Sequence, residues 1–244
     1  MDNPLAGIIY LVKGLRLIAA PGLRRFVIIP LLINTALFIA VIWFGFGQIG
    51  NAVDWLITKL PDWLQWLSWL FYLVFGLLCL LFVFFTFSLF ANIIAAPFND
   101  VLCAAVLKKL KGGMLPDAMN QAGFIRQIVP SILNEIKKFS YFIGWSIPFL
   151  ILLVIPGVNI IGSVLWFLFT AWMLNIEYME YPMSQNHLDF ARQKALFKQR
   201  KILSYSFGGV VSVATLIPVV NFLVMPAAVA GAAALWVEQY DQTQ

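Results

Sequence analysis

Directly before the first long apolar run of the chain stands Pro21-Gly22-Leu23-Arg24-Arg25-Phe26. The run from Phe26 to Phe46 has 21 residues and no charge, and about 20 apolar helical residues cross the ~30 Å hydrocarbon core of a bilayer. Pro21 disfavours continuation of a preceding helix, and Gly22 allows the backbone to turn sharply. We therefore expect a spanning helix over residues 23–46, with Arg24 and Arg25 at a membrane surface.

The same turn has two properties of an anion site. A helix that begins near Leu23 leaves its first N–H groups unpaired, and the positive end of its dipole lies beside the two guanidinium groups. The residues alone also allow a simpler interpretation, in which Arg24 and Arg25 only anchor the helix at lipid phosphates.

The composition is that of an all-α integral membrane protein. Of the 244 residues, 62% are hydrophobic and 11% are charged, with a mean hydropathy of +0.90, whereas soluble domains average about 25% charged residues. The net charge is +5, but the basic residues are spread over segment ends, which argues against a nucleic-acid partner. The two cysteines, Cys79 and Cys103, provide no disulfide framework and no metal-binding spacing.

Residues 1–20 predict an amphipathic helix that lies in the membrane interface. Lys13 and Arg16 fall on one side of such a helix, and apolar residues recur on the other at helical spacing. These apolar residues are Leu5, Ile8, Ile9, Val12, Leu15 and Ile18.

A second long transmembrane helix is expected over residues 67–111. Most of it lies in a stretch from Trp63 to Asn99 without a charge, and it ends at Gly112-Gly113 after Asp100 and three lysines. The more polar connection Gly47–Trp66 carries part of an aromatic belt, Trp55, Trp63, Trp66 and Trp69. By the positive-inside rule, this connection faces outward and the basic ends face the cytoplasm.

The remainder reads as two repeated helical hairpins, residues 139–176 and 202–237. Their turns are Ile155-Pro156-Gly157-Val158-Asn159 and Ile217-Pro218-Val219-Val220-Asn221. Charge cannot decide whether the hairpins span the membrane, but turns this apolar favour re-entrant hairpins with buried tips, covered by protein or a water-filled cavity. Asn159 and Asn221 are expected to cap the returning helices, whose N-termini would then favour an anion.

Several motifs, in this order, resemble the CysZ family of bacterial sulfate transporters over nearly the whole chain. The motifs are Pro21-Gly22-Leu23-Arg24-Arg25-Phe26, Asp62-Trp63-Leu64-Gln65-Trp66-Leu67-Ser68, Ile94-Ala95-Ala96-Pro97-Phe98-Asn99, the two Ile-Pro-x-Val-Asn turns, and Tyr181-Pro182 with Asn186-His187. The resemblance implies a homo-oligomer in the bacterial inner membrane, with hemi-penetrating hairpins, that takes up sulfate for cysteine biosynthesis. It places the sulfate-binding residues at Gly22, Leu23, Arg24 and Arg25, and it suggests sulfite as a regulator.

Further polar residues are candidates for a path or gate. Glu177 and Glu180 would lie on one helix face and could pair with basic residues to close a gate, although a hydrated interfacial turn is the alternative. His187 could couple protons, or be an ordinary surface residue. The remaining candidates are Asn92, Asn99, Asn159 and Asn221, of which Asn92 and Asn99 could instead serve helix packing.

Enzyme and pump motifs are missing from the sequence. There is no Gly-x-Ser-x-Gly, no His-Glu-x-x-His and no phosphate-binding Gly-x-x-x-x-Gly-Lys-Ser/Thr. We therefore expect a single membrane domain over 1–244, without enzymatic activity, cofactor or metal, that transports in a channel-like or gradient-driven way without ATP. The alternative is a non-transporting membrane scaffold or regulator whose basic turn binds lipid headgroups.

Overall fold

A computed structural model describes residues 3–59, 66–113 and 121–241. All regular secondary structure in these ranges is helical, as expected. The α-helices are α1 (Ala6–Ala19), α2 (Arg25–Ile57), α3 (Ser68–Leu110), α4 (Gln121–Val154), α5 (Asn159–Gln185), α6 (Phe190–Gln199), α7 (Lys201–Thr215) and α8 (Pro218–Gln239).

Four helical segments of the described residues are long and apolar enough to cross a membrane. They are Arg25–Trp43, Ile136–Val154, Asn159–Gln185 and Val220–Gln239. Three of them belong to the segments predicted as hairpins. Since α5 and α8 reach full spanning length, their length alone does not require re-entrant hairpins. The re-entrant arrangement stays a prediction.

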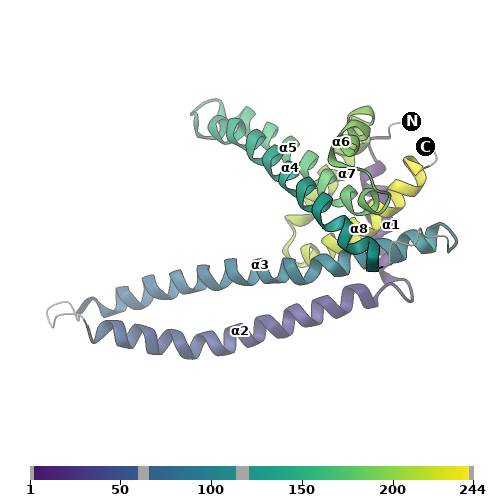
Figure 1. Cartoon of the computed structure of the whole chain (residues 1–244). Coiled ribbons are helices and arrows are strands. Elements are labelled where there is room, and N and C mark those ends of the chain that lie inside the picture. The colour runs from purple at the N-terminus through teal and green to yellow at the C-terminus, as the bar shows by residue number, and fades with distance from the viewer. Residues whose placement is uncertain (1–2, 60–65, 114–120, 242–244) are drawn as a thin grey trace. The chain divides into compact units, whose positions relative to one another are not determined.

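The chain divides into two compact units, Arg25–Phe98 and a larger one made of Met1–Arg24 with Asn99–Gln244. The smaller unit is the long helix pair of α2 and most of α3 (Figure 1). Near one end of this pair, the Tyr72 hydroxyl donates a hydrogen bond to the Asp54 carboxylate. Trp55, Trp66 and Trp69 are exposed, as an aromatic belt requires, while Trp63 lies outside the described residues.

The first long helix extends further than expected. A helix over 23–46 was predicted, whereas α2 runs from Arg25 to Ile57 and so includes much of the polar connection. The reason is that no proline follows Pro30 until Pro61, and the isolated glycines of this stretch weaken a helix without ending it. The other long helix, α3, ends where the glycine pair was expected to stop it, with φ of 71° at Gly112 and 99° at Gly113.

The first hairpin turn lies where the sequence placed it, whereas the second lies at Leu216-Ile217 and most of the predicted turn belongs to α8. α4 ends at Val154 and α5 begins at Asn159, with Gly157 at φ 83° between them. α7 ends at Thr215, and α8 begins at Pro218. Figure 1 shows α4 and α5 running side by side up to their shared turn.

The expected asparagine caps are wrong. Val158 already has helical dihedrals, φ −93° and ψ −18°, and precedes α5 without a side-chain cap, so Asn159 is the first residue of the helix. At the second turn, Pro218 begins α8 because its fixed φ suits the first helical position. Asn221 therefore falls within the first turn of α8, and its N–H donates to the Ile217 carbonyl at 2.8 Å.

Close backbone contacts hold the larger unit together. α1 packs mainly on α8 and also on α7, while α5 packs on α7. A Cβ on Gly14 would lie 1.9 Å from the Ala227 carbonyl oxygen, and one on Gly208 would lie 1.7 Å from that of Ala171. Only glycine fits at these crossings.

The same packing decides which side of α1 faces outward. Its buried side consists largely of small residues, including Gly7 and Gly14, together with Tyr10, Leu11 and Ile18. Apolar side chains that the prediction assigned to the membrane are exposed on the protein surface. They are Leu5, Ile8, Ile9, Val12 and Leu15.

Candidate functional site

The predicted anion turn has an open glycine and an anchored leucine. Gly22 is exposed with φ +88°, and a Cβ there would meet no heavy atom within 4 Å. Leu23 is buried and belongs to the larger unit. Arg24 and Arg25 are both exposed.

The helix after this turn was expected to begin at Leu23. It begins at Arg25. The N–H groups of Leu23 and Arg24 are occupied, because both donate to the Ala20 carbonyl, at 3.1 and 3.3 Å. That carbonyl lies at the end of α1, where it has no partner inside the helix. The open N–H groups of a helix start therefore belong to Arg25 and the residues after it.

The charges of the two arginines are not neutralised by a neighbouring carboxylate in the ranges that the structure covers. The guanidinium of Arg25 lies over the ring of Phe26, 4.8 Å from its centroid. An aromatic face stabilises a cation without cancelling its charge. The turn thus provides two exposed guanidinium groups that can bind an anion.

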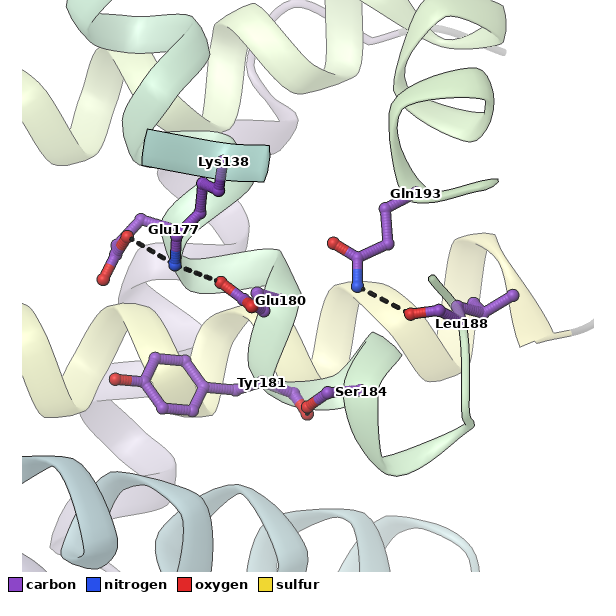
Figure 2. A network of polar contacts seen from close by, with 7 residues as sticks. All are labelled: Lys138, Glu177, Glu180, Tyr181, Ser184, Leu188 and Gln193. Carbon is purple, nitrogen blue, oxygen red and sulfur yellow. Dashed lines mark hydrogen bonds and ion pairs between the residues drawn. The ribbon is translucent and has the colours of Figure 1, made fainter. Parts of the chain in front are cut away.

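A second polar group lies at the base of the first hairpin (Figure 2). The ammonium of Lys138, on α4, is 3.3 Å from a Glu177 carboxylate oxygen and 2.5 Å from one of Glu180, both on α5. Only 13% of the Lys138 side chain is exposed, against 22% for Glu180 and 51% for Glu177. A cation this buried requires an anionic partner. The basic residue that pairs with the two glutamates is Lys138, and a gate at this position stays a prediction.

The following turns of α5 contact the last part of α3. The side chains of Tyr181 and Asn99 are hydrogen-bonded, and the Gln185 side chain donates to the Asp100 carbonyl at 2.9 Å. Asn99 is therefore a buried packing residue that joins two helices. The side chain of Asn92 lies outside the described part of the chain.

His187 has a structural role that the sequence did not reveal. It has φ +58°, and its N–H donates to the Ser184 carbonyl at 2.9 Å. The next N–H, of Leu188, donates to the Met183 carbonyl at 3.1 Å. These two bonds form a Schellman motif, in which His187 takes the left-handed position that usually belongs to glycine.

Asn159 and Asn221 are exposed at the hairpin turns. The structure does not bring Asn159 together with Glu177, because both lie on α5, about 27 Å apart at 1.5 Å per residue. The path and gate candidates therefore form no single cluster.

Sequence reasoning missed a polar network around the end of α8. The Tyr10 hydroxyl donates to Glu238 at 3.2 Å and accepts from the Gln239 side chain at 2.9 Å. Glu238 also pairs with Lys13, and Arg200 donates to the Gln239 side-chain oxygen at 2.9 Å. Burial raises the pKa of Tyr10, so its hydroxyl remains a donor at neutral pH. Arg200 lies 62 residues after Lys138, as Pro218 does after Pro156, so a comparison of the hairpins aligned on these prolines would have pointed to Arg200.

Comparison with known proteins assigns the family. A family model described as sulfate transporter CysZ/etoposide-induced protein 2.4 matches residues 10–226. The chain belongs to this family. A relative from Pectobacterium atrosepticum, named sulfate transporter CysZ, is 40% identical over 241 residues, which cover 98% of this chain and 87% of the relative. The predicted membership is confirmed, and the four apolar helical segments agree with a membrane protein.

Proposed function

We propose that this protein carries sulfate across the bacterial inner membrane into the cytoplasm and supplies it for cysteine biosynthesis. Transport is channel-like or gradient-driven, without ATP. The name of the relative from Pectobacterium supports the substrate. The observation from the structure that carries the proposal is the exposed, carboxylate-free arginine pair at the start of the first apolar helix.

Sulfate suits this turn because it is a tetrahedral dianion with an acceptor in every direction. Guanidinium groups of Arg24 and Arg25 donate two N–H bonds each to oxyanions in a planar geometry that lysine lacks. N–H groups at the start of α2 add further donors. In this proposal Gly22 leaves room for the ion, Leu23 holds the turn in place, and sulfite, which has similar oxygens, competes for the same donors and regulates uptake.

The paired glutamates form the gate in this proposal. Lys138 holds Glu177 and Glu180 together across the base of the first hairpin, and release of these ion pairs would separate α4 from α5. The two hairpins are re-entrant, with Asn159 and Asn221 at their tips, and a homo-oligomer covers the tips. Proton coupling at His187 is not part of the proposal, because its backbone position explains the residue without it.

The test is sulfate binding to a purified double variant, Arg24→Ala with Arg25→Ala, by calorimetry. We expect loss of binding with an unchanged melting temperature, since both side chains are exposed. Arg192→Ala, which removes another exposed arginine, is the control and should bind as the unmodified protein does. Full binding by the double variant would refute the site.

A flux measurement distinguishes a sulfate transporter from the alternative, a lipid-binding scaffold. Liposomes that contain the protein should take up radiolabelled sulfate faster than empty liposomes, and added sulfite should slow this uptake. A scaffold would give no uptake above the empty vesicles. The double variant in the same liposomes links the flux to the turn.

A further inference from the structure

Residues at the tips and at the bases of the two hairpins share one register. Pro156 and Pro218 are 62 residues apart. The same shift relates residues at the hairpin bases: Lys138 to Arg200, Glu177 to Gln239, and Tyr178 to Tyr240. The contacts agree with this register, because Lys138 binds Glu177 at 3.3 Å and Arg200 binds Gln239 at 2.9 Å.

The two hairpin bases differ in charge, because Glu177 of the first corresponds to Gln239 of the second. In the first hairpin, the cation contacts carboxylates, Glu177 and also Glu180. In the second, the equivalent of Glu177 is the neutral amide of Gln239, which accepts the hydrogen bond but contributes no negative charge. Amide and carboxylate oxygens both accept hydrogen bonds. Gln239 can therefore hold the Arg200 guanidinium, but it does not compensate its charge.

The other neighbours of Arg200 do not supply the missing charge. Its guanidinium lies over the ring of Tyr240, 5.4 Å from the centroid. The nearest acid along α8, Glu238, is bound by Lys13 and by the Tyr10 hydroxyl. Arg200 has no carboxylate partner among the described residues, and the adjacent Lys201 adds a second positive charge on the exposed side.

We propose that Arg200 is an oxyanion-binding residue at the base of the second hairpin, positioned by Gln239 and the face of Tyr240. A guanidinium has five N–H donors, and Gln239 engages one of its nitrogens, so donors remain for a second partner. The ligand is a tetrahedral oxyanion, either free sulfate or the phosphate of a lipid headgroup. This site is separate from the Gly22–Arg25 turn and does not depend on the function proposed there.

Binding is measured on the full chain that already carries Arg24→Ala and Arg25→Ala, so that the basic turn does not contribute. One arm uses radiolabelled sulfate in detergent, and the other counts bound phosphatidic acid by native mass spectrometry. Two variants are compared. Arg200→Gln removes the cation, and Gln239→Glu keeps it but supplies the carboxylate of the first repeat.

We expect both variants to weaken binding of the same probe at least about tenfold, as loss of a charge-assisted bond of about 1.5–3 kcal/mol predicts. Lys201→Gln removes a neighbouring charge without touching the Gln239 contact, and should change binding less than threefold. If the variants weaken sulfate binding, the ligand of Arg200 is free sulfate. If they weaken phosphatidic acid binding, the ligand is a lipid headgroup. The proposal is overturned if neither probe responds to Gln239→Glu while the melting temperature stays unchanged.

Discussion

Single glycines decide how closely the helices of the larger unit approach. Gly14 lies where a Cβ would be 1.9 Å from the Ala227 carbonyl oxygen, closer than any real contact. Gly14→Ala must therefore push α1 away from α8. We expect it to destabilise the protein by about 1–3 kcal/mol, the usual effect of overpacking, and to lower the melting temperature in detergent.

The matched control is Gly144→Ala. Gly144 is also in a helix, α4, but a Cβ there meets nothing within 4 Å. This change should be neutral or stabilise the helix by up to about 1 kcal/mol, because alanine has the higher helix propensity. Equal melting temperatures for the two variants would show that α1 does not pack on α8 through Gly14.

The two glutamates that bind Lys138 are expected to contribute differently to the stability of the protein. Glu180 is less exposed than Glu177 and is closer to the ammonium, at 2.5 Å against 3.3 Å. Water screens the Glu177 pair more strongly. We expect Glu180→Gln to lower the melting temperature more than Glu177→Gln, and the reverse order would contradict this assignment of the main partner.

At the scale of helices, the hairpin turns carry exposed apolar side chains and no charge. Val154 is 81% exposed and Leu216 is 76% exposed. If the hairpins are re-entrant, single cysteines at Asn159 or Leu216 should resist a membrane-impermeant maleimide added to either side of the membrane. Cys79 and Cys103 are first replaced by alanine.

A cysteine at Arg192, which is exposed on α6, controls for reagent access from the basic side. It should be labelled from one side only. Labelling of Asn159→Cys from the opposite side would mean that the first hairpin spans the membrane.

Sequence alone predicted the all-helical membrane class, the turn between α4 and α5, and the end of α3 at Gly112-Gly113. It did not predict the start of α2 or the asparagine caps, because these depend on local competition: the Ala20 carbonyl takes two N–H groups, and Pro218 begins its helix by itself. Gly14 could not be recognised as a contact residue, since its partner lies more than 200 positions away.

The second polar network was missed for a different reason. Two cues in the sequence give different registers for the repeat, because Ser140-Tyr141 and Ser204-Tyr205 are 64 residues apart, whereas Pro156 and Pro218 are 62 apart. In the register of the Ser-Tyr pairs, Arg200 corresponds to the apolar Ile136 and not to Lys138. The contacts of Lys138 and Arg200 at the hairpin bases agree with the register of the tips.

For the whole molecule, the large apolar surface raises the question of assembly. Candidate spans such as Ile136–Val154 are almost entirely unburied within one chain, so lipid or further copies must cover them. The proposed homo-oligomer predicts that light scattering of the purified protein gives a multiple of 27.5 kDa after correction for detergent. A protein mass of one chain would contradict it.

The contact of α1 with α8 also constrains the order of biosynthesis. α1 is made long before its partners, Ser206, Ala227 and Gly231, so it cannot dock until α7 and α8 have been synthesised. Until then, its glycine side has no partner. The larger unit can therefore close only after α8 has been synthesised.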